Sequence, residues 1–189
     1  AFQNDSLGSD DAVGLADKIK KGELSASLVT RDAIERAKAV NPKLNAITVE
    51  NFDLAQTNSE KPFTGFFQGV PTFIKDTDEV PGLPLYLGSR SLPGEPSDKY
   101  SKAAKQIIDT GLNCLGTTTT PEFGLTGTTE SLRFGATCNP WNTAYSTGGS
   151  SGGSSALVAA GVIPIAHAND GAGSILSLIH ISEPTRRYE

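Results

Sequence analysis

Residues 69–76 read Gly69-Val-Pro-Thr-Phe-Ile-Lys-Asp76, and the predicted fold is built around this stretch. Its apolar centre is typical of a buried strand, and the strand ends at two charged residues. A helical pattern follows over residues 98–109, and Leu112-Asn-Cys-Leu115 then has the character of a second short strand. A strand, a helix and a strand in this order predict a parallel pair and an α/β fold, with a mixed sheet flanked by helices.

Two helices are expected upstream of this stretch. Apolar residues at helical spacing begin at Ala12, and Gly22 ends that first helix. Ser25 is the expected N-cap of a second helix, which Asn41-Pro42 is expected to stop. Residues 1–9 are polar, and we expect them to be disordered.

Further elements are expected around the central unit. Residues 46–49 have a strand pattern, and residues 53–59 suit a short polar helix. Residues 116–155 form a long irregular stretch rich in Thr, Gly and Ser. Such a stretch in a compact domain is usually functional or disordered, and its scattered aromatic and proline residues favour an ordered loop. Residues 152–160 then turn helical, and residues 162–166 are expected to add a strand.

The composition narrows the class of protein. The chain has 189 residues, of which 37% are hydrophobic and 20% charged, as expected of one globular domain. The net charge is -5 and no basic block occurs, so nucleic acid is not expected as a partner. The apolar runs are far shorter than the roughly 20 residues of a membrane-spanning helix. We therefore expect a small-molecule substrate and no membrane partner.

The cysteines and histidines argue against a metal site. Cys114 and Cys138 are the two cysteines, and with two histidines they show no metal-ligand spacing. We expect no metal and no cofactor, with reduced thiols in a cytoplasmic protein. No signal peptide is visible. The sequence contains no methionine, however, so we expect that the true start is missing or has been removed. An export signal would have been lost with it.

The stretch Thr147-Gly-Gly-Ser-Ser-Gly-Gly-Ser-Ser-Ala156 carries the chemical argument. Gly-Ser runs are common flexible linkers, yet a linker has no reason to continue directly into an apolar helix and a strand. A phosphate cradle is the other option, but no Gly-x-x-x-x-Gly-Lys-Ser/Thr motif occurs. Small residues suit close backbone approach at a helix start. Together with Lys75 and Asp170-Gly-Ala-Gly-Ser174, the stretch indicates serine-lysine acyl transfer.

Residues 10–175 resemble the amidase signature family. Four separated motifs carry the resemblance: 69–76, Thr120-Pro-Glu-Phe-Gly124, Asn139-Pro-Trp-Asn142 and the glycine-serine hallmark at 148–156. Within the family, residues 139–146 and 167–170 are similar to bacterial hydrolases of cyclic nylon oligomers, the 6-aminohexanoate-cyclic-dimer hydrolases. The resemblance implies an amide-bond hydrolase that acts through a serine acyl-enzyme.

The same resemblance implies a role for each site residue. Ser174 would be the nucleophile, Lys75 the base, and Ser150, after a cis peptide bond, the bridge between them. The backbone N–H groups of three residues would form the oxyanion hole: Gly171, Ala172 and Gly173. The family has glycine where this chain has Ala172, and alanine is tolerated only if its φ is negative.

Alternatives remain open for several of these residues. His167 could serve a Ser-His-Asp hydrolase, although no Gly-x-Ser-x-Gly elbow is present. Asp170 could be a catalytic acid or could organise its turn through Asx hydrogen bonds. Lys75 could be a solvated strand end and Ser150 a helix cap. A non-catalytic amide-binding or amidotransferase-type subunit of the same fold is the alternative function.

The resemblance stops after Ile175. Residues 176–189 resemble translated adapter or vector sequence, and we expect them to lie outside the domain. The family domain is much longer, so the chain would be an N-terminal, truncated fragment of it, and we expect this fragment itself to be inactive. A homodimer of the full-length protein is one expectation that the sequence leaves open.

Overall fold

The computed structural model describes residues 4–182. Its helices are α1 (Ala12–Lys20), α2 (Ala26–Leu44), α3 (Phe52–Ser59), α4 (Lys102–Ile108), α5 (Gly152–Ala159) and α6 (Ile179–Ser182). Its strands are β1 (Ile47–Glu50), β2 (Pro71–Lys75), β3 (Asn113–Thr118), β4 (Glu130–Ser131), β5 (Gly135–Ala136), β6 (Cys138–Asn139) and β7 (Asn142–Ser146). Two 3₁₀ turns are η1 (Glu122–Gly124) and η2 (Leu176–Leu178).

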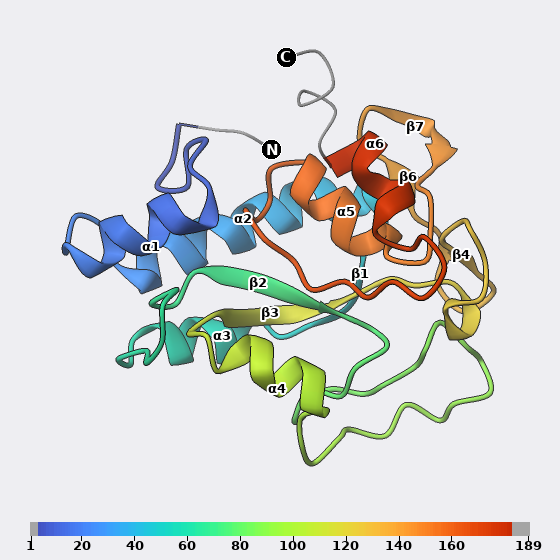
Figure 1. The fold of residues 1–189 in the computed structure, drawn as a ribbon, viewed down its shortest axis with the longest axis horizontal. Helices are drawn as coiled ribbons and strands as arrows, with labels where there is room; N and C mark the ends of the chain where they lie inside the picture. The colour runs from blue at the N-terminus through green and yellow to red at the C-terminus, as the bar shows by residue number, and fades with distance from the viewer. Residues whose placement is uncertain (1–3, 183–189) are drawn as a thin grey trace.

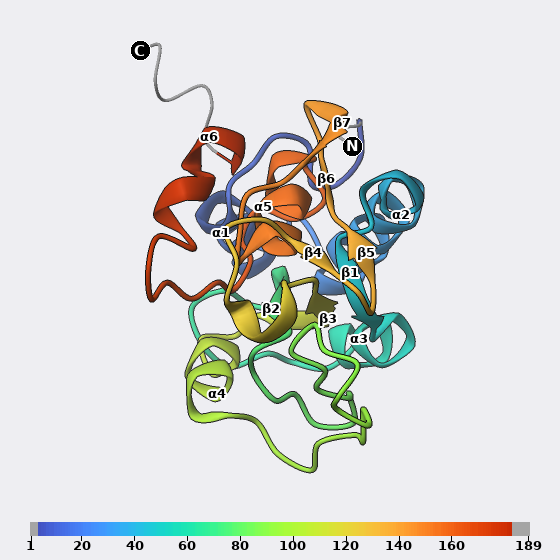
Figure 2. The ribbon, with the colours of Figure 1, turned by 90° about the vertical axis from the view of Figure 1, so that its right-hand side faces the viewer.

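The central sheet has the strand order β1-β3-β2. Strand β3 pairs parallel to β2 and antiparallel to β1, so the sheet is mixed. Helices α1, α2 and α5 lie on one side of this sheet, and α3 and α4 lie on the other (Figures 1 and 2). The predicted α/β fold with a parallel strand-helix-strand unit is therefore confirmed.

The side chains on the two faces of the sheet belong to two different hydrophobic clusters. Phe73 of β2 and Leu115 of β3 join the larger cluster with α1, α2 and α5. Their chain neighbours Ile74 and Cys114 face the smaller cluster, which includes Ala104 of α4. This alternation follows from the period of two in a strand, and it buries every residue of β2.

The end of α2 differs from the sequence prediction. Ser25 is the N-cap as expected, and its side chain accepts a hydrogen bond from the Leu28 N–H. Pro42, however, lies inside the last turn, where the helix continues to Leu44. Asn41 holds this last turn, because its carbonyl accepts the Asn45 N–H at 2.8 Å and its Oδ1 accepts the N–H groups of residues 46 and 47 at 2.8 and 3.1 Å. The prediction that Asn41-Pro42 stops the helix was wrong for this reason.

The N-terminal segment packs more closely than its polar composition suggests. Leu7 is 3% exposed and belongs to the larger cluster. The carboxylate of Asp5 accepts a hydrogen bond from Nε of the buried Arg36 at 2.8 Å. The expectation of disorder therefore does not describe residues 4–9, and residues 1–3 lie outside the described residues.

The expected strand at residues 162–166 does not form. This segment runs beside β2. Thr72 Oγ1 of β2 donates to the Ile165 carbonyl at 3.0 Å, and the N–H of His167, just after the segment, donates to the Phe73 carbonyl at 2.9 Å. Pro164 lies in the middle of the segment and has no N–H to donate. A regular ladder is therefore absent here.

The long irregular stretch is ordered, as its apolar anchors predicted. It contains the hairpins β4-β5 and β6-β7. After it, α6 packs on α5, and Leu178 of η2 and Ile181 of α6 are buried. That residues 176–189 lie outside the evolved domain stays a prediction, and residues 183–189 are outside the described part of the chain. Between residues 4 and 182, no helix combines the length and apolar character needed to cross a membrane.

Candidate active site

Lys75 is the last residue of β2 and is fully buried. Its Nζ donates to Ser150 Oγ at 2.7 Å and to Asn169 Oδ1 at 2.7 Å. Burial lowers the pKa of Lys75 to about 8, although the carboxylates of Asp170 and Asp78 oppose this shift. The side chain is thus placed and tuned to exchange a proton near neutral pH.

Ser150 lies just before α5, where the chain passes very close to its neighbours. The peptide bond between Gly149 and Ser150 is cis. A Cβ added at Gly149 would lie 2.8 Å from the Thr126 carbonyl oxygen, and one at Gly153 would lie 2.5 Å from the backbone nitrogen of Thr119. The glycines therefore allow a tight fit at the start of a helix, which is incompatible with a flexible linker.

Three side chains form a continuous hydrogen-bonded chain. Lys75 Nζ donates to Ser150 Oγ, and Ser150 Oγ donates in turn to Ser174 Oγ at 2.9 Å. The residues come from the end of β2, the start of α5 and the turn before η2. The structure therefore brings together all three residues proposed from the sequence for the catalytic triad.

Asp170 organises the turn that carries Ser174. Its Oδ2 accepts the N–H groups of Ile175 at 2.8 Å and Leu176 at 3.0 Å, and its Oδ1 accepts the Gly173 N–H. These backbone hydrogen bonds hold the pKa of the Asp170 carboxyl well below its usual range. This geometry favours the turn-organising interpretation of Asp170 over that of a catalytic acid.

The same turn bears on the expected oxyanion donors. Gly173 has a φ of +106°, whereas Ala172 is not among the positive-φ residues, so the alanine is tolerated without strain. The Gly173 N–H is engaged by Asp170. Among residues 4–182, no acceptor is recorded for the N–H groups of Gly171 and Ala172, and both residues are exposed.

His167 is buried beside Lys75 but is turned away from the serines. Its Nδ1 accepts the Lys75 backbone N–H at 3.2 Å, and its Nε2 lies 3.8 Å from Asp78 Oδ2. Burial lowers the pKa of His167, which favours the neutral imidazole. With both ring nitrogens directed elsewhere, the geometry does not support His167 as the base for Ser174.

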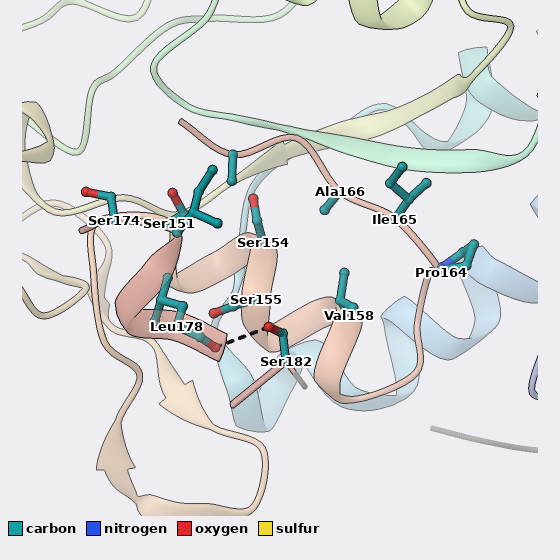
Figure 3. Close-up of a pocket in the computed structure, with 12 residues that line it drawn as sticks. Ser151, Ser154, Ser155, Val158, Pro164, Ile165, Ala166, Ser174, Leu178 and Ser182 are labelled. Carbon is teal, nitrogen blue, oxygen red and sulfur yellow. Dashed lines mark hydrogen bonds between the residues drawn. The ribbon is translucent and has the colours of Figure 1, made fainter. Parts of the chain in front are cut away.

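A cavity of about 220 Å³ adjoins Ser174 between α5, residues 164–168 and α6. Figure 3 shows Ser174 and Ser151 at one end and Pro164 and Val158 at the other. Its walls are largely apolar. The Ser174 hydroxyl points away from the centre of this cavity, which therefore borders the nucleophile rather than surrounding it.

Asn169 is a site residue that the sequence interpretation missed. Its Oδ1 accepts from Lys75 Nζ, and its Nδ2 donates to Thr77 Oγ1 at 2.6 Å. The sequence feature that could have indicated a role for Asn169 is its position directly before Asp170, in the segment that leads to Ser174. The described residues contain no cluster of three His, Cys, Asp or Glu side chains suited to a metal.

The sequence of the chain is similar to those of known amidases. Residues 28–177 match the family model described as Amidase. The AmiC protein of Mycobacterium tuberculosis is 48% identical over 178 residues, which cover 93% of this chain and 37% of that protein. The 6-aminohexanoate-cyclic-dimer hydrolase of Paenarthrobacter ureafaciens is 39% identical over 168 residues, which cover 87% of this chain and 34% of that protein.

A solved structure shows the same relationship in three dimensions. The structure of 6-aminohexanoate cyclic dimer hydrolase complexed with substrate superposes with a TM-score of 0.85 at 38% identity. The superposition covers 90% of this chain and 36% of that chain. The chain thus spans little more than a third of the length of the relatives that it matches.

Proposed function

The chain belongs to the amidase signature family, and on that premise we propose that its site hydrolyses an amide bond through a serine acyl-enzyme. One observation carries the proposal: the hydrogen-bonded chain from Lys75 through Ser150 to Ser174. A serine hydroxyl at its ordinary pKa is a poor nucleophile and needs an adjacent base. Neutral Lys75 is that base, and Ser150 passes the proton.

In the first step, Ser174 Oγ attacks the amide carbonyl carbon. The Ser174 proton moves to Ser150 Oγ while the Ser150 proton moves to Lys75 Nζ, which becomes an ammonium. The tetrahedral intermediate then collapses, the carbon–nitrogen bond breaks, and the proton returns through Ser150 to the leaving nitrogen. Water attacks the resulting ester by the same relay, which releases the acid and restores Ser174.

The relay requires a particular direction of hydrogen bonding. In the structure Lys75 donates toward Ser150 and Ser150 toward Ser174, which is the arrangement of a charged lysine. A neutral amine has two hydrogens, so it can still donate to Asn169 while its lone pair accepts from Ser150. Rotation of the two hydroxyl hydrogens then reverses the chain without moving a heavy atom. With a pKa of about 8, about a tenth of Lys75 is neutral at pH 7.

The developing oxyanion requires N–H donors near Ser174. We assign this role to the turn 171–173, as the family resemblance suggests, with Gly171 and Ala172 as the principal donors. Both amides lack an intramolecular acceptor in the described chain, whereas the Gly173 amide must first leave Asp170. Losing one such donor typically lowers the rate by about 10²–10³-fold.

Covalent labelling tests the proposal. A serine-directed fluorophosphonate added to a full-length version of the protein should give one adduct, which peptide mapping places on Ser174. Ser174→Ala should abolish the adduct, and Ser150→Ala should slow its formation strongly. A folded protein that forms no adduct would instead support a non-catalytic amide-binding subunit of the same fold.

The substrate class is proposed only as linear or cyclic amides. The relative solved with its substrate acts on a cyclic dimer of 6-aminohexanoate, as its name states. A screen of small linear and cyclic amides with Ser174→Ala as the blank would distinguish these classes. Release of free acid identifies hydrolysis, whereas transfer of ammonia to a second substrate identifies the amidotransferase alternative.

A further inference from the structure

Asp76 is a buried carboxylate that the proposed reaction does not use. It directly follows Lys75 and is fully buried, and its backbone N–H donates to the Thr118 carbonyl of β3 at 3.0 Å. Its Oδ1 accepts the Tyr86 N–H at 3.1 Å, and its Oδ2 accepts the Gly88 N–H at 3.3 Å. The sheet thus presents a fixed carboxylate that holds the turn at 86–88.

That turn is in close contact with a second one. The Phe123 N–H donates to the Leu87 carbonyl at 2.7 Å. Gly88 packs so closely that an added Cβ would lie 2.5 Å from the Thr120 carbonyl oxygen. Ser89 Oγ also donates to Glu122 Oε1 at 2.5 Å. We call residues 86–89 and 120–124 together the two-turn rim.

The two-turn rim is hydrogen-bonded to the Ser150 backbone and lies near its side chain. Thr120 Oγ1 donates to the Ser150 carbonyl oxygen at 3.0 Å. An added Cβ at Gly124 would lie 3.4 Å from Ser150 Oγ, so Gly124 lies about one methyl group away from the hydroxyl that links Lys75 to Ser174. Movement of the rim would therefore move Ser150.

The backbone of the rim is held in an unfavourable conformation. Leu87 has a φ of +48° and Phe123 a φ of +52°, and neither is glycine. Such residues persist only where the surroundings over-determine them, and they cluster at functional sites. Here the two strained residues share one hydrogen bond, and the buried carboxylate of Asp76 fixes the turn that contains Leu87.

We propose that Asp76 is a positioning residue, which holds the two-turn rim against Ser150 and so keeps Ser150 in line between Lys75 and Ser174. This inference rests on the proposed function, because it assigns Ser150 the role of proton relay. A displacement of about 1 Å in such a relay can lower the rate by about 100-fold, since the reacting groups must stay within hydrogen-bond reach.

The test is steady-state kinetics of Asp76→Asn in a full-length version of the protein. Asparagine keeps the shape but turns an amide donor toward one of the two rim N–H groups. We expect kcat to fall about 10- to 100-fold while KM changes less than about threefold. The matched control is Asp98→Asn, which removes an exposed carboxylate of the same loop and should leave kcat unchanged.

Amide hydrogen exchange supplies a readout that is independent of turnover. Exchange at Tyr86 and Gly88 should accelerate in Asp76→Asn, while the amides of β3 keep their protection. Unchanged kcat in the folded variant would overturn the inference, whatever the exchange rates. If Asp76→Asn does not fold, Thr120→Val takes its place, because it removes only the hydroxyl that donates to Ser150. A several-fold lower kcat in this variant would support the positioning role of the two-turn rim, and a wild-type kcat would refute it.

The control Ser174→Ala separates this inference from the proposed function. If Ser174→Ala is inactive and Asp76→Asn is fully active, only the positioning role fails. If Ser174→Ala retains wild-type turnover, the proposed function itself fails.

Discussion

The two ends of the hydrogen-bonded chain are built differently. Lys75 and Ser150 are 0% and 4% exposed and are fixed by the sheet and by the start of α5. Ser174 is only partly buried and lies in a turn in which the Asp170 carboxylate accepts three backbone N–H groups. The base is therefore prepared by burial, which tunes its pKa, whereas the nucleophile is prepared by local backbone hydrogen bonds.

The largest effect is expected at the buried end. Lys75→Met keeps the bulk of the side chain but removes the base, so the rate of amide hydrolysis should fall by about 10²–10⁴-fold. The matched variant His167→Asn alters a buried neighbour that also contacts Lys75 and should retain most of the activity. The reverse pattern, with an active Lys75→Met and an inactive His167→Asn, would contradict the lysine assignment.

Stability should show the same contrast between the two regions. Phe73 is fully buried beside the strand end that carries Lys75, so Phe73→Ala should lower the free energy of unfolding by about 3–5 kcal/mol. Ile175 follows Ser174 and is 45% exposed, so Ile175→Ala should cost less than about 1 kcal/mol. Denaturant unfolding measures both, and equal losses would show that the turn is as much a part of the core as β2.

A smaller effect is expected from loosening the turn alone. Asp170→Asn removes the charge that accepts three backbone N–H groups, so Ser174 should be held less well. The rate of fluorophosphonate labelling should fall about tenfold, as expected when a reacting group is misplaced but present. Thermal stability should hardly change, because the carboxylate is exposed. Wild-type labelling in this variant would mean that the turn holds its shape without Asp170.

A separate effect concerns stability as a function of pH. Burial raises the pKa of Asp76 to about 7 in the folded protein, above the ordinary value of 3.8. Between these values the folded state retains a proton that the unfolded state has lost, so the free energy of unfolding should decrease as pH rises from about 4 to about 7. The unfolding curve of Asp76→Asn should lack this component. Parallel pH profiles for wild type and variant would contradict the assignment.

The sequence predicted the buried region better than the turn-rich regions. The strand that ends at Lys75 and the helix capped by Ser25 follow from apolar spacing and a capping residue, and both formed as expected. The prediction from Pro42 was wrong because local hydrogen bonds to Asn41 hold the end of the helix beyond the proline. The segment 162–166 has strand composition, but Pro164 and sparse pairing with β2 prevent a ladder.

The residues of the site could be predicted from the sequence, but the contacts that hold them in place could not. Lys75, Ser150 and Ser174 could be named from their motifs, and the structure brings their side chains within hydrogen-bond distance. The contacts of Asn169 with Lys75, and of Asp76 with the turn at 86–88, join residues far apart in the chain or hidden in a loop. No local periodicity reports such contacts, so they emerge only from the folded arrangement.

The pH dependence of Ser174 labelling decides whether neutral Lys75 activates the nucleophile. If neutral Lys75 activates Ser174 through Ser150, the rate of fluorophosphonate adduct formation should rise with pH to a plateau, with a midpoint near the Lys75 pKa of about 8. Lys75→Met should remove this rise and leave only slow labelling. A midpoint close to the ordinary histidine pKa of about 6.5, unchanged in Lys75→Met, would show that Lys75 does not activate Ser174.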